Sequence, residues 1–309
     1  MRTISVVTPT FNEEANVREL YRQTKEVFAG LPAYRYEHIF IDNASTDRTV
    51  AILKEIAATD PQVKVIVNAR NFGHIRSPYY GLLQASGDAA ILIVADLQDP
   101  PSLIPTFVER WEQGEKIVIA VKTASGESPL LFAIRKLYYR LVSSLSETPL
   151  IRNFSGFGLY DRSVLDVLRT IQDPYPYFRG LVLEVGPKPS IVPFQQPQRK
   201  RGISKNNFYT LYDIAMLGIT SHSKVPLRIA TIAGFFLSAV GLLVALGYLV
   251  AKLVFWNTFS AGIAPIVVGG FIFFSIQLFF IGLIGEYVAA IHTQTLRRPL
   301  VTEKERVNF

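Results

Sequence analysis

The sequence predicts an α/β protein with a doubly wound, mostly parallel sheet, followed by two membrane-spanning helices. Strand and helix patterns alternate over the first 120 residues, as they do in parallel sheets whose faces are covered by helices. The 309 residues are 49% hydrophobic with a mean hydropathy of +0.25, which is too apolar for one soluble domain. The excess lies in two uncharged runs, 229–251 and 264–285, and a bilayer crossing takes about 20 residues.

Strands and helices are expected to alternate in the first part of the chain. Short apolar runs predict strands at 3–9, 37–42, 63–68, 89–95 and 116–121. The stretches between them predict helices near 13–28, 47–58, 76–86 and 103–113. Ser45, Thr46 and Asp47 are residue types that cap helices, and they stand at the start of the second one.

The pattern changes after residue 121. Residues 129–146 suit an amphipathic helix, and strands are expected at 180–186 and 190–196. Residues 206–223 mix aromatic and polar groups, which is typical of a helix lying along a bilayer surface. The expected organisation is a globular domain over 1–205, an interfacial region over 206–228, two spans within 229–285 and a tail over 286–309.

Basic residues around the two spans predict their orientation. They are Lys224 and Arg228 before the first span and Arg297 and Arg298 after the second, whereas the connecting loop carries only Lys252. By the positive-inside rule, both termini then lie in the cytoplasm. No signal-peptide pattern precedes the first strand, so we expect a protein of the inner (cytoplasmic) membrane with its globular domain in the cytoplasm.

The net charge of +7 and the pI near 9.5 indicate an anionic partner. The basic segment 198–205 lies close to the first span, which favours a membrane surface or a phosphorylated substrate over nucleic acid. The chain contains no cysteine, which excludes thiol catalysis and thiolate metal sites.

Polar side chains gather where the predicted strands end. Because the carboxyl ends of parallel strands meet at one edge of a sheet, where α/β proteins bind ligands, these side chains predict a binding site. The candidates are Thr10, Asn12, Glu13, Asp42, Asn43, Asn71, Gly73, Asp96 and Gln98.

The segment "ADLQDPP" (95–101) is the candidate cation site. Asp96 and Gln98 offer the oxygen ligands that Mg²⁺ and Mn²⁺ prefer, and such ions keep substrate phosphates in their coordination shell. Asp99 is expected instead to cap the helix that begins after Pro101. The sequence has neither a Walker A motif nor GxGxxG, so neither a P-loop NTPase nor a dinucleotide oxidoreductase is supported.

Several segments together resemble the inverting family 2 glycosyltransferases. They are "VVTPTFNEEANV", "IDNASTDRT", "ARNFGH", "ASGD", "ADLQDPP", "GFGLYDRSV", "RGISK" and "IGEYV". More narrowly, the whole chain is similar to the polyprenyl-phosphate glycosyltransferases with two C-terminal helices, of the bactoprenol glucosyltransferase type. The resemblance implies a GT-A fold (a Rossmann-like, mostly parallel sheet), a nucleotide-sugar donor, Mg²⁺ or Mn²⁺, a polyprenyl phosphate acceptor, the lipid bilayer as partner, and a homotetramer.

The resemblance also implies roles for individual residues. Those implied for the nucleoside are Pro9, Thr10, Glu13 and Asp42, and those near the diphosphate are Asn71 and Gly73. Asp96 and Gln98 would hold the metal. The cations placed at the lipid phosphate, or closing over the donor, are Arg135, Arg179 and the hinge Arg199–Lys205, which includes Arg201 and Lys205.

Two positions depart from the pattern of these relatives. Val94 stands where many of them have an acid two positions before Asp96, and Gly156 precedes Phe157 where some have Asp. With Val94 apolar, the strand is expected to bury that side chain and leave Asp96 as the first acid at the sheet edge. A lipid phosphate is already anionic at pH 7, so transfer to it needs no strong general base and activity is still expected.

The leading hypothesis is transfer of glucose from UDP-glucose to undecaprenyl phosphate with inversion of the anomeric carbon. GDP-mannose and UDP-N-acetylglucosamine stay open as donors, because no residue discriminates between them on physical grounds. A processive polysaccharide synthase would need more membrane helices and a QxxRW motif, which the sequence lacks. A non-catalytic, membrane-anchored protein that binds nucleotide sugars is the third alternative.

Overall fold

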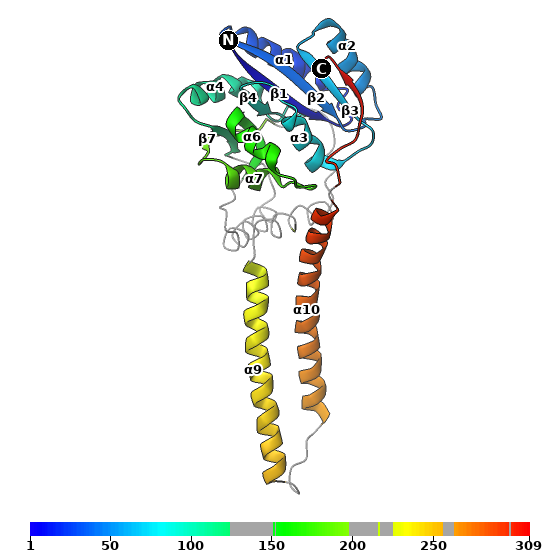
Figure 1. Ribbon diagram of the computed structural model, residues 1–309, viewed down its shortest axis with the longest axis vertical. Helices are drawn as coiled ribbons and strands as arrows, with labels where there is room; N and C mark the ends of the chain where they lie inside the picture. The colour runs from blue at the N-terminus through cyan, green and yellow to red at the C-terminus, as the bar shows by residue number, and fades with distance from the viewer. Residues whose placement is uncertain (124–150, 152, 198–215, 217–224, 256–262, 297) are drawn as a thin grey trace.

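The computed structural model describes residues 1–123, 151, 153–197, 216, 225–255, 263–296 and 298–309. They form an α/β domain from which two long helices extend side by side (Figure 1). The strands are β1 (Arg2–Thr10), β2 (Tyr34–Asp42), β3 (Val63–Asn68), β4 (Ala89–Leu92), β5 (Ile117–Lys122), β6 (Phe154–Asp161), β7 (Ser190–Phe194) and β8 (Glu303–Val307). The helices are α1 (Val17–Ala29), α2 (Thr49–Thr59), α3 (Gly73–Leu83), the short 3₁₀ turn η1 (Pro101–Leu103), α4 (Ile104–Glu112), α6 (Arg162–Thr170), α7 (Phe178–Val185), α9 (Val225–Val254) and α10 (Ile263–Thr295).

The described strands form one mixed, mostly parallel sheet in the order β7-β5-β6-β4-β1-β2-β3-β8. β1 pairs in parallel with β2 and β4, and β2 pairs in parallel with β3. β6 runs antiparallel to β4 and β5, and β8 runs antiparallel to β3. The strand order reverses at β1, so the topology opens a crevice at the carboxyl ends of β1 and β4.

Helices cover both faces of the sheet. On one face, Leu20 of α1 and Phe107 of α4 pack with Val6, and α2 packs over β2 and β3 beside them. On the other face, Leu82 of α3 and Leu165 of α6 pack with Val7. Alternate residues of β1 therefore contribute to opposite halves of the core, as expected for a central strand buried on both sides.

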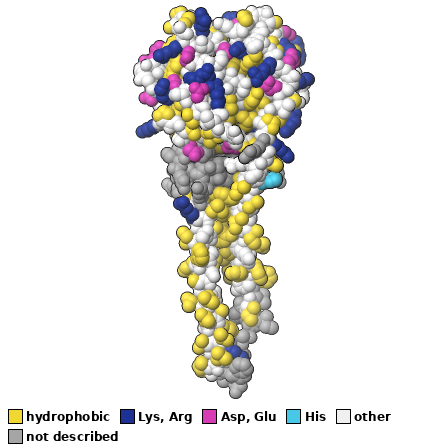
Figure 2. Space-filling model, in the orientation of Figure 1, with side chains coloured by type: hydrophobic (Ala, Val, Ile, Leu, Met, Phe, Trp, Pro, Cys, Tyr) yellow, Lys and Arg dark blue, Asp and Glu magenta, His cyan; other side chains and the backbone are white. Residues whose placement is uncertain are grey.

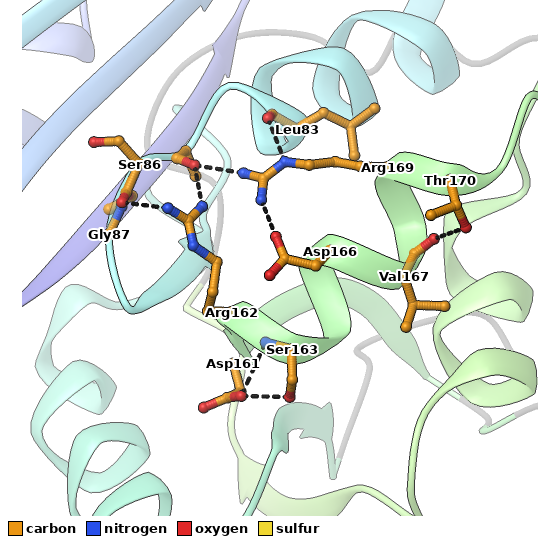
Figure 3. A network of polar contacts seen from close by, with 12 residues as sticks. Leu83, Ser86, Gly87, Asp161, Arg162, Ser163, Asp166, Val167, Arg169 and Thr170 are labelled. Atoms are coloured by element: carbon orange, nitrogen blue, oxygen red, sulfur yellow. Dashed lines mark hydrogen bonds and ion pairs between the residues drawn. The ribbon is translucent and has the colours of Figure 1, made fainter.

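Two arginines of α6 donate hydrogen bonds to the backbone around the loop that joins α3 to β4 (Figure 3). Arg162 donates from Nη1 to the carbonyl of Ala85 (3.0 Å) and from Nη2 to that of Ser86 (2.8 Å). Arg169 donates from Nε to the carbonyl of Leu83 (3.1 Å) and from Nη2 to that of Ala85 (2.6 Å). α6 thus satisfies the backbone of this loop at the end of the sheet opposite the crevice.

The two long C-terminal helices carry the apolar excess of the chain. Val225–Val254 and Gly269–Thr295 are long and apolar enough to cross a membrane. Their visible surface is covered by hydrophobic side chains, whereas charged side chains concentrate on the α/β domain (Figure 2). The expected spans 229–251 and 264–285 lie within α9 and α10.

The strand expected at 180–186 is wrong, because Phe178–Val185 forms helix α7. A short apolar run fits a strand or a buried helix equally well by periodicity. Packing decides here, since Leu181 and Val182 are buried in the core on the α3 and α6 side of the sheet. The strand expected at 190–196 is present as β7.

β4 is shorter than expected, and β6, α6 and β8 were not anticipated as elements. β4 ends at Leu92, although the amide of Ile93 still donates to the carbonyl of Val7 (3.0 Å). β8 lies within the stretch 286–309 that was expected to be a tail. The amphipathic helices expected at 129–146 and 206–223 lie outside the described residues, except for Met216.

Candidate functional site

A pocket of about 520 Å³ opens at the carboxyl ends of the central strands. It brings together these residues from the predicted site: Pro9, Thr10, Glu13, Asn43, Asn71, Gly73 and Asp96. Its other lining residues are Phe11, His74, Ser77, Pro78, Val94 and Ala95. The polar residues that follow the predicted strands in the sequence therefore line one pocket in the structure.

The turn between β1 and α1 forms one wall of the pocket. Asn12 adopts a left-handed conformation (φ 56°), which a short amide side chain tolerates. Its Oδ1 accepts the amide of Thr46 (2.8 Å), and its own amide donates to Ser45 Oγ (2.9 Å). The amide of Glu13 donates to Thr49 Oγ1 (2.8 Å). The turns after β1 and β2 therefore hold each other in place.

Asp42 lies behind the pocket, and the described lining does not include it. The residue is fully buried at the end of β2, where its carboxylate accepts the amide of Ser45 (2.8 Å) and the hydroxyl of Thr10 (3.2 Å). Burial raises the pKa of Asp42, whereas the hydrogen bonds from Ser45 and Thr10 oppose the rise. Asp42 joins the ends of β1 and β2, and its role in holding the nucleoside stays a prediction.

Asn43 organises the loop that follows β3. Its Oδ1 accepts the amide of Phe72 (2.8 Å), and its Nδ2 donates to Asn71 Oδ1 (2.8 Å) and to the carbonyl of Gly73 (3.1 Å). The amide of Gly73 also donates to Asn71 Oδ1 (2.8 Å). Gly73 has a φ of 83°, which glycine adopts without strain. The loop thus presents Asn71 and Gly73 to the pocket in a fixed arrangement.

The segment after β4 supplies the only carboxylate besides Glu13 in the described lining. Asp96 Oδ1 accepts the amide of Gln98 (3.1 Å) across a tight turn in which Leu97 has a φ of 61°. Val94 is half-buried and lines the pocket, because β4 ends before it. The expectation that the strand buries Val94 is therefore wrong. Gln98 lies outside the described lining.

Asp99 does not cap the following helix, contrary to expectation. Pro100 occupies the cap position of η1, and no side chain in the described structure bonds the first turn. Asp99 is 1% exposed, and its Oδ2 has no hydrogen-bond partner among the described residues. Burial raises the pKa of Asp99 to about 7, with Lys122 opposing the rise and Asp96 adding to it.

The side chain of Arg179, on α7, lies close to the part of the pocket that α3 lines. Burial, together with the nearby charge of Arg179, lowers the pKa of His74, so this lining residue is neutral at pH 7. Arg179 lies over the ring of Tyr177 (5.3 Å to the centroid) and donates to the carbonyl of Phe154 (3.4 Å). The other predicted cations, Arg135, Arg201 and Lys205, lie outside the described residues.

Sequence reasoning did not single out most of the α3 side of the pocket. His74, Ser77 and Pro78 come from the first turns of that helix. A signal was available, because residues that follow a strand-end loop in a parallel sheet face the same crevice. Their side chains could not be assigned to the pocket without knowing where α3 begins.

The chemistry of the lining fits a hard divalent cation only in part. Asp96 supplies a carboxylate of the kind that Mg²⁺ and Mn²⁺ prefer. Within the described residues, no three His, Cys, Asp or Glu side chains form a metal-binding group. The donors among the described residues are therefore incomplete, and an ion held by Asp96 would take further oxygen ligands, which a bound diphosphate could supply.

Comparisons with known proteins agree with this architecture. Residues 5–169 match the glycosyl transferase family 2. The glycosyltransferase YkcC of Bacillus subtilis is 36% identical over 96% of this chain and 91% of its own length. The bactoprenol glucosyl transferase of Shigella phage SfV is 33% identical over 96% of each chain.

Among solved structures, glucosyl-3-phosphoglycerate synthase from Mycobacterium tuberculosis, in complex with Mn²⁺, UDP and phosphoglyceric acid, is 21% identical. The superposition covers 71% of this chain and 76% of the synthase chain, with a TM-score of 0.46. The family match spans more than half of the present chain, and the relatives match nearly all of it. The chain therefore belongs to glycosyltransferase family 2.

Proposed function

We propose that this glycosyltransferase transfers a hexose from a nucleoside diphosphate sugar to undecaprenyl phosphate or a related polyprenyl phosphate, with UDP-glucose as the first candidate donor. One observation carries the proposal: a strand-end pocket containing Asp96 and two long apolar helices occur in the same chain. α3 and α7, which flank the pocket, lie on the side of the domain nearer those helices (Figure 1). The similarity to bactoprenol glucosyl transferases over almost the full length supports the choice of acceptor and sugar.

In the proposed reaction, a phosphate oxygen of the acceptor attacks the anomeric carbon from the face opposite the leaving group. The new bond joins that carbon to the phosphate, and the bond to the diphosphate breaks with its electron pair leaving on UDP. The acceptor phosphate is already anionic, so no residue has to remove a proton from it. The chain contributes by orienting the two reactants, with Asn71 and Gly73 proposed for the diphosphate.

Bound Mg²⁺ or Mn²⁺ would neutralise the charge that develops on the leaving diphosphate. Asp96 is the residue proposed to hold it, with assistance from Gln98. Arg179 is proposed to pair with a phosphate at the membrane side of the pocket, since a guanidinium binds phosphate oxygens in a fixed geometry. The same role is proposed for Arg135 and Arg201, and Lys205 is proposed to contact the donor.

One observation favours a second candidate function. Val94 lines the pocket beside Asp96, which leaves the proposed metal with a single carboxylate from this segment. A chain of this kind could bind a nucleotide sugar at the membrane without turning it over. The two functions share the donor and differ only in whether the sugar reaches a lipid.

Transfer of radiolabel to lipid tests the proposal directly. Membranes containing the protein and undecaprenyl phosphate are incubated with Mn²⁺ and labelled UDP-glucose, GDP-mannose or UDP-N-acetylglucosamine, beside membranes without the protein. We expect label from UDP-glucose in the butanol-extractable lipid. Binding of UDP without label in lipid from any donor would instead establish the second function.

We also propose that the protein lies in the inner membrane with both termini in the cytoplasm and forms homo-oligomers. The first part rests on the positive-inside pattern together with the two apolar helices. Light scattering of the purified protein in detergent measures the mass of the assembly, for which the family resemblance predicts a tetramer.

A further inference from the structure

The strand that follows the two apolar helices returns to the α/β domain beside the pocket. β8 pairs with β3, with Val307 opposite Val65 and Glu303 opposite Asn68. Just before β8, the carbonyl of Thr302 accepts the amide of Ala69 (2.8 Å). β8 therefore fixes the first residue of the loop whose later members, Asn71 and Gly73, line the pocket.

One residue of β8 also binds the helix on the far side of that loop. Arg306 Nη2 donates to Gln84 Oε1 (2.9 Å) and to the hydroxyl of Tyr80 (3.3 Å), and both partners lie at the carboxyl-terminal end of α3. Glu303 orients the guanidinium through Arg306 Nε and Nη2. Phe309 packs over the guanidinium at 4.7 Å from ring centroid to Cζ. The guanidinium is therefore held by groups on two sides.

α3 depends on such outside contacts more than an ordinary helix does. Pro78 lies inside it, and a proline cannot donate the backbone hydrogen bond that would join it to the first turn. Gly73, at its start, has intrinsically high backbone freedom. The first turn, which supplies Gly73, His74 and Ser77 to the pocket, therefore has weak support from the helix itself.

We propose that β8 is a positioning element for the donor site, and that Arg306 is the positioning residue through which it holds α3. The hydrogen bond from Ala69 fixes the beginning of the pocket wall 69–78, and the contacts of Arg306 with Tyr80 and Gln84 fix its end. Arg306 itself is not part of the described lining and acts through α3. The inference rests on the proposed function only in naming the ligand of this wall as a nucleoside diphosphate.

The test compares R306A with K304A in the full-length protein in detergent. The side chain of Lys304, an exposed residue of the same strand, forms no hydrogen bond or ion pair with the other described residues, so both variants remove one positive charge from β8. We expect R306A to raise the Kd for UDP and the KM for the donor about fivefold, the size of one net hydrogen bond, with kcat within a factor of two. K304A should match the wild type, and R306K should recover part of the loss.

Hydrogen exchange of the protein without ligand provides a second readout that does not require transfer. Amides of 69–77 should exchange faster in R306A, whereas those of β1 should keep their wild-type protection. Unchanged UDP affinity together with unchanged exchange in 69–77 would overturn the inference, and so would faster exchange throughout the domain. If the wild type bound UDP but made no glycolipid, the proposed function would fail while these two readouts would still decide the role of β8.

Discussion

Asp96 and Val94 both line the pocket, and only the first can bind a cation. We expect D96N to lower metal-dependent transfer by on the order of 100-fold, because the amide replaces the charged ligand from this segment. It should also abolish the increase in UDP affinity that Mn²⁺ produces. Calorimetric titration of UDP with and without Mn²⁺ measures this effect, and E115Q on the protein surface is the control. Full metal-dependent turnover by D96N would contradict the assignment.

A substitution at position 94 adds a carboxylate to this segment, whereas D96N removes one. V94D adds a carboxylate beside Asp96, whereas V94T changes polarity at similar volume without adding charge. If one carboxylate limits the site, V94D should bind Mn²⁺ without UDP at least about tenfold more tightly than V94T. Equal affinities would place the metal away from this segment.

His38 predicts part of the pH dependence of stability. The imidazole is fully buried on β2, with Nε2 2.9 Å from Thr8 Oγ1 and the ring stacked on Phe40. Burial lowers the pKa of His38 to about 3, compared with about 6.5 in an unfolded chain. Between these values the unfolded state binds more protons, so the free energy of unfolding falls as the pH is lowered.

Acidification from pH 7.5 to 5 should therefore cost about 2 kcal/mol through His38. We expect H38Q, whose side chain does not titrate, to show a pH dependence that is shallower by this amount in denaturant titrations. H292Q, at the exposed end of α10, should retain the wild-type slope. An unaltered slope in H38Q would show that the imidazole takes up its proton over this pH range in the folded state as it does in the unfolded chain.

At the level of single residues, the sequence identified acids and amides at strand ends but not what each one contacts. Asp96 reaches the pocket, whereas Asp42 is turned behind it and Asp99 is buried without capping a helix. These acids and amides could be identified because the ends of the predicted strands can be located in the sequence. Their orientations depend on local φ values, such as that of Leu97, which no propensity specifies.

Among the secondary-structure elements, α6 makes a stabilising contact that can be tested by truncation. R169A removes the hydrogen bonds to the carbonyls of Leu83 and Ala85 (Figure 3). We expect the free energy of unfolding to fall by about 1–3 kcal/mol, because the carbonyl of Leu83 loses its side-chain partner and that of the buried Ala85 keeps only Arg162. R18A, which breaks an exposed ion pair with Glu55, should change it by no more than about 0.5 kcal/mol.

The main effect of R169A should be on stability, because the loop lies at the end of the sheet opposite the pocket. Since Leu83 is the last residue of α3, any rise in the Kd for UDP should be no larger than in R306A. Thermal denaturation and the Kd for UDP, measured on the same preparation, separate the two properties. A large change in UDP affinity with little loss of stability would contradict this role for α6.

The sequence predicted well the part of the domain in which strands and helices alternate along the chain. The strands and helices from β1 to β5 lie within a few residues of the predicted ranges, because each has its own apolar period. β8 could not be predicted from Glu303–Val307, whose residues are mostly charged and form a strand only because β3 offers an open edge. α7 was mistaken for a strand because its short apolar run fits either kind of element. Only its packing against the rest of the core determines that it is a helix.

For the whole molecule, the sheet constrains the topology in the membrane. β1 and β8 belong to the same sheet, so the residues before α9 and after α10 must lie on one side of any membrane that these helices cross. We expect tags placed before Met1 and after Phe309 to be accessible together in inside-out vesicles and protected together in intact cells. A tag after Phe309 accessible only from outside the cell would contradict this arrangement.

The pairing of β8 with β3 also has a consequence for biosynthesis. The ribosome makes β8 after both apolar helices, so β3 presents an unpaired row of N–H and C=O groups until these helices have emerged. If α10 failed to return across the membrane, β8 would be delivered to the wrong compartment and this edge would stay open. The sheet is therefore completed only when both helices are correctly inserted. A misinserted chain carries an exposed strand edge that proteases and chaperones can recognise.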